Sequence, residues 1–168
     1  MLGRASFDRT GQYRYTLSRR WSQGPRRACF CLLNPSTADA RRNDPTVRRC
    51  IGFAQEWGFD ALEVVNIFAL RATDPRELAR HPAPIGPGND RAIRRAAHRA
   101  DFVVLGWGAH GSRFDRGRQV AQMLQIHCQL HCLGLTAEGH PKHPLYLPRS
   151  TQPIPFPHTS LASDAVWV

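Results

Sequence analysis

Polar residues that can do chemistry follow four short apolar runs of the sequence, within residues 34–39, 66–75, 106–111 and 139–147. Asn34 and Asn66 carry amides, which can orient water or pair with a ligand but cannot accept a proton. Asp39 carries a carboxylate, which can act as a base, and His143 carries an imidazole, which can donate to an anion. The four segments therefore contain the components of a hydrolytic or ligand-binding site.

The apolar runs themselves predict strands that would hold these segments. Residues 28–33 and 102–105 are apolar without polar alternation, which is typical of a strand buried on both faces of a parallel sheet. Residues 62–68 form a second predicted strand, and residues 133–135 begin the last one. In an open α/β sheet the ligand lies outside the carboxyl ends of the strands, so the four polar segments are expected to meet at one edge.

Helices are predicted between the strands. Asp44 is suited to be an N-cap, Pro45 to be the first helical residue and Gly58 to end this helix. Further helices are expected over residues 90–100 and 116–126. Strands and helices that alternate in this way predict a three-layer α/β/α fold with a mostly parallel central sheet.

The 168 residues fit one α/β domain with extensions at both ends. Residues 13–17 alternate after a turn at 9–11, which predicts an N-terminal β-hairpin and loop within residues 1–25, with Arg14 and Arg19 on the exposed side. Prolines predict an extended tail over 150–168 that packs along the surface. No apolar run approaches a membrane span, and no signal segment precedes Asp8, so we expect a cytoplasmic protein without a membrane partner.

The net charge is +10, from 23 Lys and Arg against 13 Asp and Glu. Residues 1–50 contain 11 Arg and three acidic residues, so most of the excess lies in the N-terminal third. A clustered excess of this kind favours a polyanionic partner, and nucleic acid or a nucleotide before lipid. The alternative is that 22 Arg against one Lys reflects codon bias, with arginine on solvated faces.

The five cysteines include no CxxC pair, so a disulfide framework is not predicted. His127, Cys128, His131 and Cys132 have spacings that would suit zinc on one face of a helix. The block runs into a predicted strand, however, where these side chains would not converge. We therefore expect buried Cys and partly buried His, with neither metal nor cofactor, and keep a zinc protein as a third hypothesis.

Each polar segment also has a purely structural explanation. Asn34 and Asn66 can form Asx turns, and Gly106, Gly108 and Gly111 can simply permit a tight turn after a strand. Histidines beside prolines, at 140 and 143, can be surface loop residues. Four such segments at one sheet edge nevertheless favour a site over four independent coincidences.

Three stretches resemble a family of bacterial proteins of unknown function, DUF1643, across nearly the whole chain. They are LNPSTAD at residues 33–39, DPTVRRC at 44–50 and the stretch from 65 to 75. This resemblance is specific, but it carries no activity.

The order of the four segments is also similar to the motifs of the uracil-DNA glycosylase superfamily. Asn34-Pro35 matches its first motif, Asn66 ends the second core strand, the glycine turn at 105–109 matches the third, and His143-Pro144 matches the late His-Pro motif. Arg71 and Pro75 match the thermophile-type branch. The departures are Leu32 and Ser36 in the first motif, no stacking aromatic after it, and no counterpart to the iron-sulfur cysteines.

This second resemblance implies a uracil-DNA-glycosylase-like fold and an N-glycosidase that releases a base from nucleic acid or a nucleotide. Asn34 would then orient water, Asp39 would accept its proton, and His143 would donate to the departing base. Asn66 would pair with the base edge, Phe68 or Trp107 would supply the missing aromatic, and the remaining ligand contacts would come from Pro35, Arg71 and Gly108. The alternative is a non-catalytic nucleic-acid or nucleotide-binding module on the same fold.

Overall fold

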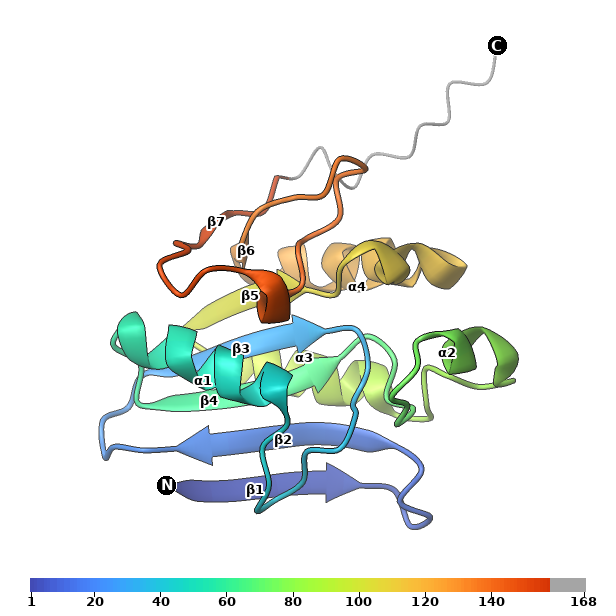
Figure 1. The fold of residues 1–168 in the computed structure, drawn as a ribbon, viewed down its shortest axis with the longest axis horizontal. Coiled ribbons are helices and arrows are strands. Elements are labelled where there is room, and N and C mark those ends of the chain that lie inside the picture. Colours follow the sequence, from blue (N-terminus) through green and yellow to red (C-terminus); the bar gives the residue numbers. More distant parts are fainter. Residues whose placement is uncertain (158–168) are drawn as a thin grey trace.

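The computed structural model describes residues 1–157 and contains one seven-stranded sheet (Figure 1). In spatial order its strands are β1 (Leu2–Phe7), β2 (Arg14–Arg20), β4 (Ala61–Asn66), β3 (Arg27–Leu32), β5 (Phe102–Gly106), β6 (Leu130–Cys132) and β7 (Ile154–Pro155). The helices are α1 (Pro45–Glu56), α2 (Arg76–Arg80), α3 (Asn89–Arg99) and α4 (Arg116–Gln125), with 3₁₀ segments η1 (Ala109–Asp115) and η2 (Pro144–Tyr146). Within the described residues, none of these helices has the length and apolar character to cross a bilayer.

The sheet is mostly parallel, as predicted. The central strands β4, β3, β5 and β6 pair in parallel, and the predicted N-terminal hairpin, β1 and β2, adds to β4 in antiparallel register. Strand β7 pairs antiparallel with β6, and Phe156 after it is buried, so the start of the predicted tail extends the sheet. The rest of that tail, from residue 158, lies outside the described residues.

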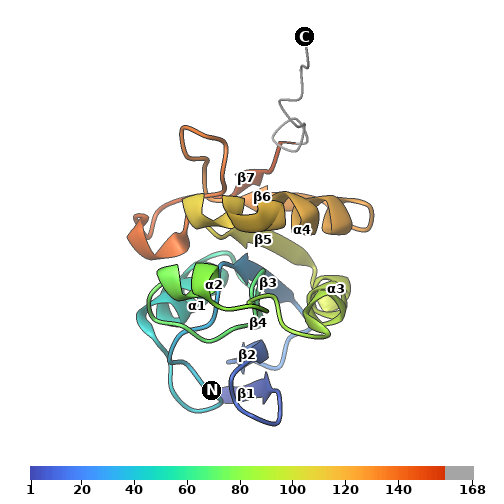
Figure 2. The ribbon, with the colours of Figure 1, turned by 90° about the vertical axis from the view of Figure 1, so that its right-hand side faces the viewer.

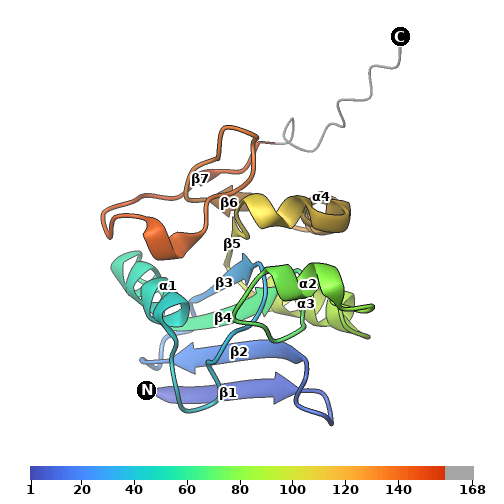
Figure 3. The ribbon, with the colours of Figure 1, turned by 45° about the vertical axis from the view of Figure 1, so that its right-hand side comes forward.

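The helices cover the sheet on both faces and give three layers (Figures 2 and 3). On one face, Phe53 of α1 belongs to a core cluster with Phe30 and Leu62 of the sheet. On the other face, Ile93 of α3 and Val120 of α4 belong to a second cluster. The continuous apolar character of β3 and β4 follows from this arrangement, because both faces of these strands are buried.

Helix α1 begins and ends where the sequence predicts. The Asp44 side chain accepts a hydrogen bond from the Val47 amide at 2.8 Å, Pro45 is the first helical residue, and Gly58 follows the helix in left-handed backbone geometry with φ +76°. The predicted helices over 90–100 and 116–126 are also confirmed, as α3 and α4.

Two expectations from the sequence are wrong. The last parallel strand is Leu130–Cys132 and not 133–135, because Gly134 has φ +110° and ends the extended backbone before it could continue. Arg14 and Arg19 are 2% and 3% exposed instead of lying on the open side of the hairpin, because their guanidinium groups bind backbone carbonyls of the loop after β3.

The strand order creates a topological switch point between β3 and β5. The chain leaves β3 through α1 to reach β4 on one side, and it later returns through α3 to β5 on the other side of β3. The loops after β3 and β5 therefore diverge to opposite sides of the sheet, which opens a crevice at their carboxyl ends.

Candidate functional site

A cavity of about 530 Å³ lies at the carboxyl ends of β3 and β5. Its lining residues are drawn from 33–37, 44–46, 72–75, 108–110 and 143–146, so each of the four polar segments of the sequence contributes to it. This cavity, which we call the switch-point pocket, brings together three of the nine predicted site residues, namely Asn34, Gly108 and His143.

Asn34 has its amide nitrogen fixed by the loops around it. The Nδ2 group donates to the carbonyl of Pro35 at 3.0 Å and to the carbonyl of Ala72 at 2.8 Å. Both N–H donors of the amide are thereby used, so Oδ1 is the atom with which Asn34 can receive a hydrogen bond from water or a ligand. The same bonds tie the loop after β3 to the loop after β4.

His143 is held as a hydrogen-bond donor. Its Nδ1 accepts from the Leu145 amide at 3.3 Å, where it serves as the N-cap of η2. A ring whose Nδ1 accepts must carry the proton of its neutral form on Nε2. Burial lowers the pKa of His143 below its ordinary value, and the nearby Asp44 carboxylate opposes that shift. The neutral ring can therefore donate from Nε2.

Asp44 is the carboxylate that lines the switch-point pocket. It is 9% exposed, and its Oδ1 accepts from Val47 as the cap of α1, which leaves Oδ2 for other contacts. Its influence on the pKa of His143 indicates that the two side chains are electrostatically coupled. In the sequence, Asp44 is recognisable only as a helix cap, because the capping pattern already accounts for an Asp before a proline.

Asp39, the predicted base, is not brought to this pocket. Its Oδ1 accepts from the amides of Arg41 at 2.7 Å and Arg42 at 2.8 Å, so the carboxylate closes a tight turn. These backbone hydrogen bonds lower the pKa of Asp39. A carboxylate used in this way stabilises the loop, and Asp39 is not among the residues that line the pocket with Asn34 and His143.

Asn66, the predicted partner of the base edge, is also turned away from the pocket. It is 2% exposed, and its Oδ1 accepts from Nη2 of Arg14 at 3.3 Å. Its backbone carbonyl accepts from the side chain of Asn89 at 2.9 Å. Asn66 therefore belongs to a buried polar network beneath the loops.

The remaining predicted contacts lie outside the pocket lining. Phe68 is buried in the core, and Trp107 fills the space beside Gly111, where an added Cβ would clash with its ring. Arg71 donates to the carbonyl of Gly11 at 3.1 Å and lies over Phe7, so it holds the hairpin turn. Pro35 is buried, and its carbonyl accepts from the Ala72 amide at 2.9 Å.

Two buried arginines of β2 fix the loop that carries Asp44 into the pocket. Arg14 donates to the carbonyl of Ala38 at 2.9 Å. Arg19 donates to the carbonyls of Asp39 at 2.5 Å and Arg42 at 3.1 Å, and its Nε donates to Asn43 Oδ1 at 2.8 Å. Desolvation lowers the pKa of Arg14 to about 10, which leaves the group charged at neutral pH.

The lining of the switch-point pocket is polar and carries little positive charge. It contains neither Arg nor Lys, and its hydroxyl groups come from Ser36, Thr37, Thr46, Thr73 and Tyr146. With one carboxylate and the histidines 110 and 143, this lining suits a neutral polar ligand better than a phosphate group.

The side chains of the histidine and cysteine block, residues 127–132, do not converge on one point. His131 stacks on Phe102 with ring centroids 3.9 Å apart, Cys128 lies 3.5 Å from the Leu124 carbonyl, and Cys132 is buried in the core. Across residues 1–157, no group of three or more His, Cys, Asp or Glu side chains is arranged to hold a metal ion.

Comparison with known proteins identifies a family. The family model described as "Protein of unknown function (DUF1643)" matches residues 14–145, which contain β2 to β6 and all of the residues that line the pocket except Tyr146. Neither the curated proteins nor the solved structures include one that matches this chain.

Proposed function

Because the chain belongs to the DUF1643 family, whose description assigns no activity, we propose a function from the pocket: an N-glycosidase that releases a nucleobase from nucleic acid or a nucleotide by water attack. The observation that carries the proposal is the meeting of Asn34, Asp44 and His143 in one cavity at the switch point of the sheet. The resemblance of the sequence motifs to the uracil-DNA glycosylase superfamily supports it, and we include a uracil-DNA-glycosylase-like fold in the proposal.

The reaction breaks the C1′–N bond of a nucleoside unit. The electron pair of that bond leaves with the base, so negative charge develops on the base and positive charge on the sugar. Water then forms the new C1′–O bond and gives up a proton. A site for this reaction needs a donor toward the base, a negative group near the sugar and a base for the water proton.

His143 would serve the departing base. As a neutral ring with Nδ1 occupied by the Leu145 amide, it would donate from Nε2 to a carbonyl oxygen of the base on which charge accumulates. A donor fixed before the reaction stabilises developing charge without reorganisation. The burial that lowers the pKa of His143 also keeps this donor neutral at physiological pH.

Asp44 and Asn34 would serve the sugar and the water. The Asp44 carboxylate would stabilise the positive charge on the sugar and accept the water proton at Oδ2, since Oδ1 is bound to Val47. Asn34 would orient the water through Oδ1, because its amide nitrogen is bound to two carbonyls. Asp44 thus takes the role that the sequence analysis gave to Asp39.

The surroundings of the pocket are compatible with a substrate that carries phosphates. A neighbouring hollow of about 480 Å³ shares Pro45 and Leu145 with the pocket and is lined by Arg48, Arg49 and Arg149. A base bound in the arginine-free pocket would leave its sugar-phosphate chain near these cations. We therefore propose nucleic acid as the partner in preference to a free base.

A non-catalytic binding module is the second candidate function. The observation that favours it is the structural use of the same polar groups: Asn34 Nδ2 and Asp44 Oδ1 both stabilise loops and a helix. A pocket built in this way could bind a base without acting on its glycosidic bond.

The two candidates are separated by testing for abasic sites. The protein is incubated with oligonucleotides that carry uracil, hypoxanthine, or mismatched or modified bases, and the strands are then treated with alkali to cleave abasic positions. Strand cleavage at one of these bases, lost in Asp44→Asn, supports the glycosidase. Binding of the same oligonucleotides without cleavage of any of them overturns it and favours the binding module.

A further inference from the structure

Helix α3 presents a row of cationic side chains that the proposed reaction does not use. Arg91, Arg94, Arg95 and Arg99 are exposed, while Ile93 and Ala96 on the opposite side of the helix are buried in the core. None of these four arginines is among the residues that line the switch-point pocket.

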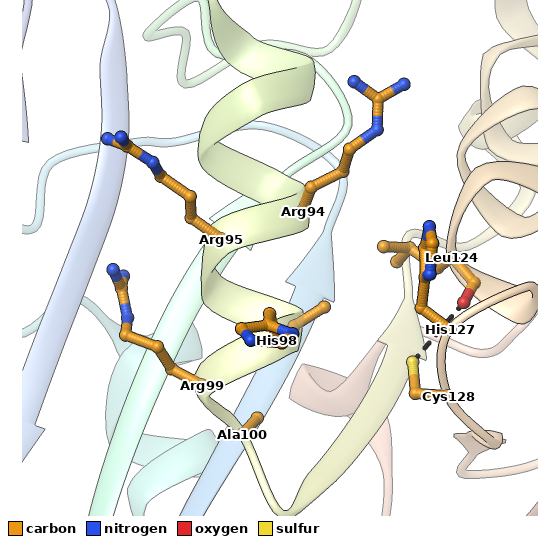
Figure 4. Close-up of a pocket in the computed structure, with 9 residues that line it drawn as sticks. Arg94, Arg95, His98, Arg99, Ala100, Leu124, His127 and Cys128 are labelled. Carbon is orange, nitrogen blue, oxygen red and sulfur yellow. Dashed lines mark hydrogen bonds between the residues drawn. The ribbon is translucent and has the colours of Figure 1, made fainter.

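The surface between α3 and α4 is hollowed beside this row (Figure 4). A groove of about 500 Å³ is lined by Arg94, Arg95, Arg99, His98 and His127, with an apolar floor that includes Leu124, and its lining contains no carboxylate. Figure 4 shows Arg94 leaving α3 on the side of α4, whereas Arg95 and Arg99 leave on the other side.

Two further hollows continue the groove across α3 to the N-terminal hairpin. Arg95 and Arg99 also line a hollow of about 400 Å³ together with Arg91. Arg99 lines a third hollow, of about 530 Å³, together with Arg4, Arg20 and Arg27. With the buried Arg19, which also lines the third hollow, eight arginines border one chain of adjoining hollows, which we call the α3 arginine surface.

Negative charge on this surface is limited to one residue. Glu63 is the carboxylate among the lining residues of the three hollows, and it pairs with Arg99 at 2.6 Å and Arg27 at 3.3 Å. Because Glu63 is 3% exposed, it fixes two guanidinium groups without presenting its own charge to solvent. In the described part of the chain, Arg91, Arg94 and Arg95 form no ion pair.

We propose that the α3 arginine surface binds the phosphate backbone of a nucleic-acid strand, as a second contact apart from the switch-point pocket. A compact anion would occupy one hollow, whereas an extended polyanion engages arginines along all three. An anionic membrane is the less suitable partner, because among the lining residues of these hollows Leu2 is the one large apolar side chain that is exposed.

The test measures binding of the full chain to a fluorescent 20-nucleotide single strand of undamaged DNA at several salt concentrations. A double variant, Arg94→Gln with Arg95→Gln, removes two cations that form no ion pair in the described residues, and it keeps good helix formers at both positions. Loss of two phosphate contacts should reduce the slope of log K against log salt by about 1.4, which corresponds to roughly 25-fold weaker binding at 0.1 M salt. Arg94→Lys with Arg95→Lys should retain the slope, since each Lys keeps its charge.

The matched control is Arg41→Gln with Arg80→Gln, which removes the same charge at exposed positions outside the three hollows. An equal loss in this control would show that net charge alone acts and would overturn the inference. So would absence of strand binding by the wild type, or binding only to vesicles that contain phosphatidylserine. Because this experiment does not score catalysis, strand binding through α3 leaves the proposed function to the abasic-site assay, and failure of that assay would overturn the proposed function alone.

Discussion

His143 is the residue whose protonation state decides whether the pocket presents a neutral donor. Burial lowers the pKa of His143 below 6.5, so the folded protein keeps the ring neutral at pH values where an unfolded chain has begun to protonate it. The stability that this residue contributes is therefore present above about pH 6.5 and is lost as pH falls toward the lowered pKa. We expect the unfolding free energy of wild type to fall relative to His143→Gln over that interval. Denaturant titrations at several pH values measure the unfolding free energies of both proteins. If the difference between the two free energies does not change with pH, the pKa shift is contradicted.

Asp44→Asn separates the charge of Asp44 from its role as a cap. Asn is as good an N-cap as Asp, so α1 should lose little stability, whereas Asp44→Ala should cost about 1 kcal/mol. The carboxylate raises the pKa of His143, so its removal should lower that pKa further. NMR titration of the His143 ring in the two proteins checks this shift. An unchanged or higher pKa in Asp44→Asn would mean that the two side chains are not coupled.

At the scale of elements, β2 fixes the loop between β3 and α1 through its two buried arginines. Arg19 alone makes hydrogen bonds to Asp39, Arg42 and Asn43. A lysine at this position cannot supply the same fork of donors, so at least one buried acceptor loses its partner. We predict that Arg19→Lys costs about 1–3 kcal/mol of stability.

The same substitution should speed amide hydrogen exchange at residues 39–43 more than in the central strands. Hydrogen-exchange mass spectrometry measures the comparison, with Arg20→Lys as the control, because Arg20 binds the carbonyls of Ser22 and Gly24 instead of this loop. Unchanged exchange at residues 39–43 in Arg19→Lys would show that Arg19 does not fix this loop.

The turn after β5 depends on a glycine that allows Trp107 to pack beneath it. A Cβ at Gly111 would lie 1.9 Å from Cδ1 of the Trp107 ring, so the ring or the η1 backbone must move. We predict that Gly111→Ala destabilises the protein by about 1–3 kcal/mol, as overpacking does. Thermal unfolding of this variant beside Gly52→Ala, whose added Cβ would meet nothing within 4 Å, provides the comparison. Equal midpoints would contradict the packing described.

Local patterns in the sequence predict the elements well where a single residue decides them. The cap at Asp44, Pro45 and Gly58 fixed both ends of α1, and the continuous apolar runs indicated β3 and β5. The three-residue strand β6 was placed too late, because its extended geometry depends on pairing with β5 and not on its own composition. The burial of Arg14 and Arg19 was also unpredictable, since their acceptors are carbonyls of a loop that lies 24 and 20 residues away along the chain.

At the scale of the whole molecule, strand order determined where the site would be but not which side chains would reach it. All four polar segments line one cavity, which opens where the loops after β3 and β5 diverge at the switch point. Asn34, Gly108 and His143 line the pocket, whereas Asp39 and Asn66 turn into their own hydrogen-bond networks. The direction of a side chain at a loop or a strand end depends on its tertiary partners. These partners cannot be predicted from the spacing of residues along the sequence.

Two functions are proposed for two surfaces that share no lining residue, a base pocket at the carboxyl ends of the strands and a phosphate surface over α3. The proposed function depends on cleavage of the glycosidic bond in the pocket. The most direct measurement is the single-turnover rate of base release, at saturating protein, from an oligonucleotide cleaved in the abasic-site assay, for wild type and for Asp44→Asn and His143→Gln. Each variant should release the base roughly a hundredfold more slowly while binding the strand with little change, because oriented groups of this kind act in the transition state. Release at the wild-type rate by both variants, or no release from any substrate by the wild type, would contradict the claim.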